Sequence, residues 1–481
     1  MWRGALLIAL VVLLAGCGGA PTATPTTTTT TTIGHPCKAR IASLVVTVID
    51  GDTLQHVRGA RVRLLRQKAT TNRRGIVVFR GPKRRLVVAV SARHYTAADV
   101  RLNFQHRIQT IRIYQPSLQW PLYGATPQRT QAQSHIRLRP PFHVVWGREM
   151  GGLIEFPAVV WDGQAYIGNI HASIRAVSMR SGKISWLHRT PVGRMASSPA
   201  IYGAYLVYHT MAGGVYVLRL RDGSQVWSWN AGSAIESSPV IRHGIDYFGT
   251  TGGSIVALDL RTHKLRWRRF LGAKVTSSVA LAGGRLFVGD YAGRLWALNP
   301  RNGATRWVGQ VNGKIYGTPA VSADRVFVPS STGDSLTAFT TGGRDLWRVT
   351  TGGYVYSSPA VWGPRVFFGS YDGSFYAVSA ATGRIAWRVP TGGPISGAAA
   401  VVDGVAYAAS FAGRILGVDV HTGRVLFRFP HGEFVPLSGN GGRLLLDGDS
   451  RLFAVEPRRK GHQHRHGKPH PPAQHHRSPR C

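Results

Sequence analysis

The sequence is poor in cysteine and in acidic residues, and each shortage excludes a class of protein. Three cysteines among 481 residues are too few for a disulfide-stapled scaffold or a multi-cysteine metal site. Only 21 acidic residues face 59 lysines and arginines, so the formal net charge is +38. Such a charge favours an anionic partner, namely nucleic acid, phospholipid headgroups or an envelope polymer. The alternative is that an arginine-rich codon usage produces the charge, which then only keeps the protein soluble.

Long amphipathic stretches of helical period are also scarce. Short runs of Val, Ile, Leu, Tyr and Phe are instead separated by Gly, Asp-Gly or Thr-Gly, and 58 glycines are present. Alternating apolar runs between turn residues are typical of strands, so the chain is predicted to be all-β. Its length is sufficient for two or three domains.

The first 17 residues are typical of a secretory signal. Arg3 precedes an apolar run over residues 5–14, which is too short to span a bilayer. The four residues that end at Cys17 read Leu-Ala-Gly-Cys and resemble a bacterial lipobox. That resemblance implies that Cys17 is lipidated and that the exported protein is anchored to the outer face of the cytoplasmic membrane or to the envelope. An ordinary signal peptide with an incidental cysteine is the alternative.

The two flanks of the chain are predicted to be disordered, because they hold almost no apolar residues. Residues 18–37 contain an unbroken threonine tract, and residues 457–481 are rich in His and Arg. The alternating histidines of this tail are candidates for binding a metal, against the alternative of a solvated tail: His462, His464 and His466. Whether Cys37 and Cys481 pair in an oxidising compartment is open.

A small β domain is predicted over residues 38–115, with six or so short strands between turn residues. Its strand and turn order resembles the carboxypeptidase regulatory-like family, a transthyretin-type β-sandwich, over residues 42–114. The matching motifs are Gly59-Ala60-x-Val62, Thr71-Asn72-x-x-Gly75-x-x-x-Phe79 and Ala92-x-x-Tyr95. The resemblance implies an adhesion or substrate-presenting module, or a passive spacer. No nucleophile–base pair is apparent in this region.

A repeat of 40 residues, once 41, dominates the rest of the chain. Each unit contains four short apolar segments and is closed by one aromatic residue: Trp146, Trp186, Trp227, Trp267, Trp307, Trp347, Trp387 and Phe427. A fixed period near 40 indicates a propeller or a solenoid, and four strands per unit favour a propeller. We expect these aromatic side chains to wedge between neighbouring blades, which is a structural role.

Counting the units predicts eight blades over residues 141–456, after a linker over residues 116–140. Three segments between residues 434 and 455 follow Phe427 without a fourth, whereas residues 142–146 form an orphan fourth strand before the first full unit. If the orphan completes the last blade, the ring closes without a free sheet edge.

The units resemble the pyrroloquinoline-quinone-type propeller repeat over residues 119–456. The marks are Ala257-Leu258-Asp259 and Ala297-Leu298-Asn299 before a turn, Thr382-Gly383 and Thr422-Gly423 within it, and the opening segment Trp120-Pro121-Leu122-Tyr123-Gly124. The resemblance implies the fold. It leaves function open, because the superfamily contains both quinone-dependent dehydrogenases and non-catalytic scaffolds, and one fold hosts many activities.

The sequence departs from the dehydrogenases of this superfamily. It has no adjacent cysteines, no long inserted loops in its uniform units, and no evident set of acidic and amide residues for calcium. Neither a Ser-His-Asp set nor a carboxylate pair can be assigned from spacing. We therefore predict a protein without a catalytic site or cofactor, with a quinone-dependent oxidoreductase as the alternative.

A binding role fits better, because two sets of loops are expected on one face of the ring. Mixed charges with exposed tyrosines suit a contact with an envelope protein or an anionic polymer. The expected protein resembles the outer-membrane assembly lipoproteins in its lipid anchor, its eight blades and its lack of a catalytic site. It differs from them in the N-terminal sandwich and the basic tail. We expect a monomer that binds no specific nucleic acid. The alternative is that these are ordinary loop residues: Arg194, Glu236, Lys274, Lys314, Tyr316, Tyr354, Tyr356 and Glu433 in one set, and His171, Met211, Asp290, Tyr291, Asp334, Tyr371, Asp372 and Phe411 in the other.

Overall fold

The computed structural model describes residues 41–458. Several sequence-based predictions concern residues outside this range: the lipidated Cys17, the pair Cys37 and Cys481, and the tail histidines His462, His464 and His466. Within the range, the only helix is the short 3-10 turn η1 (Pro116–Leu118) and all other regular elements are strands. No helix among the described residues is long and apolar enough to cross a membrane. The predicted all-β class is confirmed.

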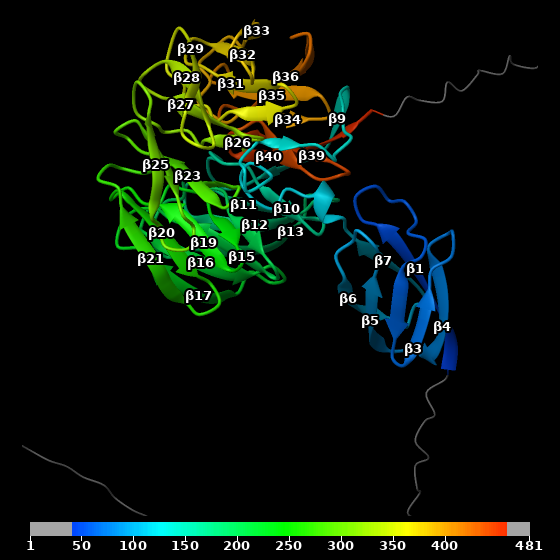
Figure 1. Ribbon diagram of the computed structural model, residues 1–481. Coiled ribbons are helices and arrows are strands. Elements are labelled where there is room, and N and C mark those ends of the chain that lie inside the picture. The colour runs from blue at the N-terminus through cyan, green and yellow to red at the C-terminus, as the bar shows by residue number, and fades with distance from the viewer. Residues whose placement is uncertain (1–40, 459–481) are drawn as a thin grey trace, which may run out of the picture.

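Two sheets form a separate unit at the N-terminal end (Figure 1). Strand β1 pairs antiparallel with β4 and parallel with β7 in the first sheet, and the second has the order β3-β2-β5-β6. Side chains alternate between buried and exposed along these strands, so one face of each sheet turns inward. Leu44, Val88 and Phe104 lie in the apolar core that both sheets share. The strands are β1 (Ile41–Asp50), β2 (Arg61–Leu64), β3 (Gln67–Thr70), β4 (Ile76–Pro82), β5 (Arg85–Ser91), β6 (Ala98–Asn103) and β7 (Ile108–Ile113).

Four antiparallel sheets of four strands follow one another in the first half of the repeats. They comprise β10 (Val159–Trp161), β11 (Gln164–Gly168), β12 (Ser173–Ser178) and β13 (Ile184–Arg189); β14 (Ala200–Tyr202), β15 (Tyr205–His209), β16 (Gly214–Arg219) and β17 (Gln225–Asn230); β18 (Val240–Arg242), β19 (Ile245–Gly249), β20 (Ser254–Asp259) and β21 (Lys264–Phe270); and β22 (Ala280–Ala282), β23 (Arg285–Gly289), β24 (Arg294–Leu298) and β25 (Thr305–Gln310).

Four further sheets complete the series. They comprise β26 (Ala320–Ser322), β27 (Arg325–Ser330), β28 (Ser335–Thr340) and β29 (Asp345–Thr350); β30 (Ala360–Trp362), β31 (Arg365–Gly369), β32 (Ser374–Ser379) and β33 (Ile385–Pro390); β34 (Ala400–Val402), β35 (Val405–Ser410), β36 (Arg414–Asp419) and β37 (Val425–Phe429), joined by β8 (Ala132–Gln133); and β38 (Leu437–Gly439), β39 (Leu444–Gly448), β40 (Arg451–Pro457) and β9 (Phe142–Glu149).

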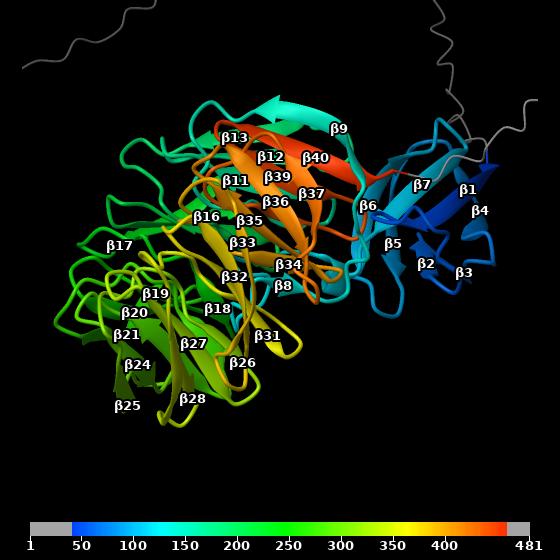
Figure 2. The same ribbon diagram turned by 90° about the horizontal axis from the view of Figure 1, so that it is seen from above.

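The last sheet combines the two ends of the repeat region. Strand β9, which precedes every full repeat, pairs antiparallel with β40, and Trp146 lies opposite Ala454. The innermost strand of this sheet, β38, also contacts β10, the innermost strand of the first sheet. Figure 2 shows β9, β39 and β40 beside β11–β13. The predicted pairing of residues 142–146 with the C-terminal strands is therefore present, and it extends to Glu149.

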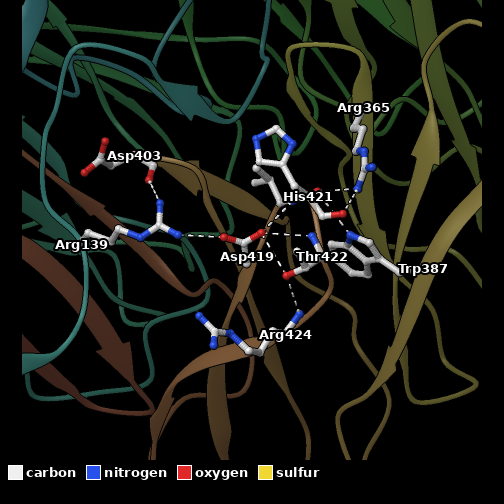
Figure 3. Close-up of polar contacts among 9 residues, drawn as sticks. Arg139, Arg365, Trp387, Asp403, Asp419, His421, Thr422 and Arg424 are labelled. Atoms are coloured by element: carbon white, nitrogen blue, oxygen red, sulfur yellow. Dashed lines mark hydrogen bonds and ion pairs between the residues drawn. The ribbon is translucent and has the colours of Figure 1, made fainter.

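The closing tryptophans join neighbouring sheets at a turn. The Nε1–H of Trp387 donates to the Val420 carbonyl oxygen of the next sheet at 3.2 Å, and Arg365 donates to the same oxygen (Figure 3). Asp419 holds that turn by accepting from the backbone N–H of Thr422 and from the Arg139 guanidinium.

The turn that packs against the closing tryptophan contains a glycine for two reasons. At Gly383 the backbone φ is +72°, and an added Cβ would lie 2.7 Å from the Trp347 ring. A side chain there would be strained and would displace the ring. The Thr-Gly turn of the repeat is thus required by the tryptophan of the preceding unit. Trp227 differs, because its ring packs against His263, which takes the positive-φ position, at a centroid distance of 4.4 Å.

The N-terminal unit contacts the repeats through Asp52. Its carboxylate accepts from Gln119 Nε2 at 2.6 Å and from Asn440 Nδ2 at 2.8 Å. Burial is the main cause that raises the pKa of Asp52 to about 7, and the nearby Asp50 adds to it. A buried carboxyl is favoured in its neutral form, whereas the hydrogen bond that Gln119 donates favours the carboxylate and opposes the rise.

Candidate functional site: the mouth of the central channel

Residues 119–133 fill the space between the innermost strands. The sequence suggested a linker here, but carbonyl groups of this segment accept backbone hydrogen bonds from six of the eight inner strands. The difference arises because inner strands have unpaired N–H groups on their channel side, and these need acceptors when buried. The donors are Val160, Ile201, Leu281, Val321, Val361 and Val401, with acceptor Trp120, Pro121, Pro127, Gln128, Thr130 and Gln131, respectively.

Arg129 is the centre of this segment and is completely buried. Its guanidinium donates to four carbonyl oxygens, those of Tyr123, Ser238, Pro239 and Val279, at distances from 2.5 to 3.0 Å. Burial lowers its pKa to about 10, so the group stays charged at neutral pH. A planar fork of donors suits this role better than lysine, because it satisfies several acceptors at once.

A ladder of hydroxyl groups links successive sheets around the channel. The backbone N–H of one unit donates to the Ser or Thr hydroxyl oxygen found 40 residues later, at 2.9 to 3.1 Å. Tyr123 in the channel segment donates its hydroxyl to the end of the ladder, Ser358 Oγ, at 3.0 Å. The hydroxyls accept from otherwise unpaired buried donors. The rungs run from Ser198 to Ser238, Ser278, Thr318 and Ser358.

A cavity of about 410 Å³ opens above this ladder at one mouth of the channel. One position of the repeat, two residues before the hydroxyl position, supplies much of its wall. Side chains of different chemistry occupy that position in units 40 residues apart, and all but Ala196 line the cavity: Phe156, Glu236, Thr276, Tyr316, Tyr356 and Ser396. Tyr123 also lines the cavity, so the channel segment contributes to it.

An aromatic arc borders the cavity on the side of the fifth to eighth sheets. We define it by its members, Tyr316, Tyr354, Tyr356, Tyr371, Phe411 and Phe434. Neighbouring ring centroids lie 5.0 to 6.1 Å apart. Several of the pairs meet edge to face, an arrangement that aromatic quadrupoles favour. Tyr354 and Phe411 remain exposed.

Charged residues occupy the opposite side. Glu236 Oε1 lies 3.1 Å from Lys274 Nζ, and Lys274 and Lys314 both lie over the Tyr291 ring, at 5.2 and 5.8 Å from its centroid. Burial raises the pKa of Glu155, which Glu236 reinforces and the Arg194 guanidinium opposes. The mouth thus has an aromatic side and a side of mixed charge, on which the two carboxylates belong to the cavity lining and the cations lie around it.

The structure gathers the predicted binding-face residues at this mouth. Glu236, Tyr316, Tyr356, Tyr371 and Phe411 line the cavity directly. Tyr354 belongs to the aromatic arc, while Lys274, Lys314, Tyr291 and Arg194 surround the two glutamates. Two other predicted loop residues have structural roles. Asp290 accepts from Trp296 and Arg294, and Asp372 accepts from the Tyr376 hydroxyl.

Sequence reasoning missed most of the other lining residues, among them Tyr123, Glu155, Phe156, Thr276 and Phe434. The repeat spacing could have identified Phe156 as a lining residue. It lies 40 residues before Ala196 and 80 residues before Glu236, at the same position of the repeat. The spacing gives no such indication for Tyr123, since the channel segment does not share the repeat.

Within residues 41–458, a buried His209–Asp246 pair resembles part of a catalytic set. Both side chains are fully buried, and His209 Nε2 lies 2.9 Å from Asp246 Oδ2. The other ring nitrogen faces the Ser237 carbonyl oxygen at 2.7 Å, so neither ring nitrogen is hydrogen-bonded to a hydroxyl group. The pair links the second and third sheets. Among residues 41–458, no group of three or more His, Cys, Asp or Glu side chains is arranged to hold a metal ion.

The cavity does not fit the quinone that the propeller superfamily suggests. Pyrroloquinoline quinone is a polycarboxylate, and a site for it requires cationic or donor groups facing those carboxylates. The lining instead carries Glu155 and Glu236 and includes no lysine or arginine. Like charges in a partly buried site repel, so this lining disfavours such a cofactor.

Comparisons with known proteins agree with the fold. Residues 143–246, 251–352 and 333–461 match the family model described as outer membrane protein assembly factor BamB. BamB from Moraxella catarrhalis has a similar structure, with 18% identity over 68% of this chain and 100% of that chain and a TM-score of 0.57. Quinohemoprotein alcohol dehydrogenase from Comamonas testosteroni has 13% identity over 70% of this chain and 80% of its own, with a TM-score of 0.62. A europium-containing methanol dehydrogenase has 11% identity over 71% and 98%, with a TM-score of 0.59.

No curated protein matches the sequence. At these identities the structural neighbours establish the fold alone, and they confirm the predicted quinoprotein-type, propeller-like architecture. The neighbours include an assembly factor and two dehydrogenases, so fold likeness does not choose between a scaffold and an enzyme.

Proposed function

Because the chain belongs to the family described as outer membrane protein assembly factor BamB, we propose that it is a non-catalytic cell-envelope scaffold that binds a protein through the mouth of its channel. The observation that carries the proposal is the aromatic arc beside the paired and unpaired charges of one partly open cavity. Exposed aromatic side chains next to polar groups are typical of the energetic centre of protein interfaces.

The proposal includes a finer description of the architecture. We assign the eight sheets to eight blades of one ring, which is supported by the contact between β38 and β10 and by the pairing of β9 with β40. We assign the N-terminal unit to the carboxypeptidase regulatory-like sandwiches, which is supported by its two sheets and single core. This unit would act as a spacer or presenting module.

The envelope location rests on the sequence at the N-terminus. We propose that the chain is exported and held by lipid on Cys17, and that the threonine-rich stretch separates the anchor from the folded units. Metabolic labelling with a fatty-acid analogue tests the anchor. Label on the wild type but not on Cys17→Ser is the expected result, whereas equal labelling would contradict it.

Affinity capture from the native envelope tests the scaffold role. The full chain, cross-linked to envelope extract, is expected to retain a defined protein that the double variant Tyr356→Ala/Tyr371→Ala loses. Phe270→Ala is the matched control, because this ring is 69% exposed on the outer strand β21 and lies outside the cavity lining. Capture of the same proteins by wild type and the double variant would show that the mouth is not the binding surface.

Two alternatives have their own tests. Incubation with pyrroloquinoline quinone and calcium, followed by a dye-linked assay with alcohols and sugars, is expected to give no turnover, and turnover would overturn the non-catalytic proposal. The net charge of +38 favours the second alternative, an electrostatic binder of an anionic envelope polymer. Binding of that kind weakens steeply as salt rises, whereas contact through the aromatic arc should be much less sensitive.

A further inference from the structure

We propose that the cavity at the channel mouth accepts a cationic side chain, arginine or lysine, that is carried next to an apolar residue in a segment of the partner protein. This inference rests on the proposed scaffold function and specifies the chemistry that the cavity recognises. It follows from the charge of the lining, from the aromatic arc and from the closed floor of the cavity.

The lining charge is opposite to that of the protein. In a chain with a net charge of +38, the side chains that line the cavity include two carboxylates and no lysine or arginine. Glu236 already has a partner in Lys274. Glu155 makes no side-chain hydrogen bond or ion pair with any residue that the structure describes. A carboxylate in a partly buried site is stabilised by a cation. The Arg194 guanidinium acts on Glu155 through its charge but forms no ion pair with it, so the carboxylate oxygens can still accept from a ligand.

The aromatic arc offers ring faces to the same ligand. The cation–π contacts of this mouth are taken by Tyr291, which faces both Lys274 and Lys314, and by Tyr123, whose ring lies against Arg129. Within residues 41–458, the rings of Tyr356 and Tyr371 face no cation. A guanidinium or ammonium group is attracted to such a face, and an apolar neighbour gains contact area on the rest of the arc.

The floor and wall limit how the ligand enters. The channel segment closes the cavity below, since Tyr123 lies between Ser358 and the buried Arg129. On the wall, the buried hydroxyl of Thr276 lies close to the Tyr291 hydroxyl. Its oxygen can also accept from a ligand N–H group. A side chain can therefore enter from the mouth, whereas a peptide cannot thread through.

Calorimetric titration with blocked dipeptides tests the inference. The full chain is titrated with the amides of N-acetyl-Phe-Arg, N-acetyl-Phe-citrulline and N-acetyl-Phe-Glu, where citrulline is a neutral analogue of arginine. We expect Phe-Arg to bind at least tenfold more tightly than Phe-citrulline and Phe-Glu to bind weakest. In Glu155→Gln this preference for arginine should fall below threefold, while Tyr371→Leu should weaken Phe-Arg at least fivefold.

A matched control separates the site from general charge. Asp345→Asn removes an exposed carboxylate of β29 that lies outside the cavity lining, so the preference should persist there. Each variant is first shown to unfold at the wild-type temperature. Equal binding of the arginine and citrulline peptides, absence of binding up to millimolar concentration, or an unchanged preference in Glu155→Gln would each overturn the inference. If capture of an envelope protein still depends on the arc in those cases, the scaffold proposal stands without it.

Discussion

The inside of the channel and its mouth lie next to each other but use their polar groups in opposite ways. Inside, Arg129 meets four carbonyl oxygens and the hydroxyl ladder satisfies one backbone N–H after another. At the mouth, Glu155 faces the cavity without a hydrogen bond or ion pair to any described residue, and rings of the arc are exposed. Polar groups that are already satisfied hold the fold together, whereas unsatisfied ones remain free to meet a ligand.

Two positions of one repeat produce this difference. The hydroxyl position is occupied by Ser or Thr in five consecutive units, and its chemistry is used between the sheets. The position two residues earlier varies from Phe156 through Glu236 and Thr276 to Tyr356, and these side chains line the cavity. The position with the same residue type in successive units is therefore structural, and the position whose residue type varies between units forms the cavity wall.

The largest expected effect on stability comes from removing the hydrogen bonds of Arg129 inside the channel. Arg129→Ala would leave four buried carbonyl oxygens without their donor and open a space behind Tyr123. An unsatisfied buried group costs about 1–3 kcal/mol, so the free energy of unfolding should fall by at least about 3 kcal/mol. Denaturant unfolding measures this. Arg301→Ala, which removes an exposed guanidinium without side-chain hydrogen bonds to described residues, should change stability by less than about 0.5 kcal/mol. Similar values for both variants would refute the structural role of Arg129.

One rung of the ladder should have a smaller effect. Thr318→Val keeps the shape of the side chain but removes the oxygen that accepts from the Ser278 N–H at 3.1 Å. The lost acceptor for a buried donor predicts a decrease of about 1–3 kcal/mol in the free energy of unfolding. Thr350→Val, on an exposed position of β29, is the control. Hydrogen exchange at Ser278 that stays unchanged in Thr318→Val would contradict this assignment.

The sequence allowed more of the repeated sheets to be predicted than of the site. The closing aromatics at 40-residue spacing predicted the sheets, and the orphan segment 142–146 predicted the partner of β40. The loop register also placed Glu236, Tyr316 and Tyr371 on one face. The channel segment could not be predicted, because its hydrogen bonds reach six separate units and its own sequence has no period. Tyr123 entered the site through that tertiary arrangement alone.

At the mouth, removal of a ring should affect binding more than stability. Tyr371→Ala deletes a partly buried ring whose neighbours, Tyr356 and Phe411, remain in place. Substitutions away from the core change stability little, so we expect a loss of about 1 kcal/mol or less in the free energy of unfolding. The affinity for the arginine dipeptide should nevertheless fall at least fivefold. Thermal unfolding and titration on the same sample measure the stability and the affinity. A large loss of stability with unchanged affinity would show that Tyr371 serves the fold and not the binding site.

The smallest effect, and the most specific, is the response of Glu155 to pH. Burial raises its pKa above the usual 4.5, Glu236 raises it further and the Arg194 guanidinium opposes them, while Lys274 neutralises Glu236 nearby. The folded protein therefore keeps this proton to a higher pH than the unfolded chain does, so this group lowers the free energy of unfolding as pH rises through the raised value. A bound cation favours the ionised form, so the preference for Phe-Arg over Phe-citrulline should decline as pH falls from 7.5 to 4.5, and binding should release a proton within that window. Titration in two buffers of different ionisation enthalpy measures the release.

The control variant for this prediction is Glu155→Gln, which should show neither the pH dependence nor the proton release. If both persisted in that variant, another acid at the mouth would be the group that contacts the cation, and Glu236 is the nearest one.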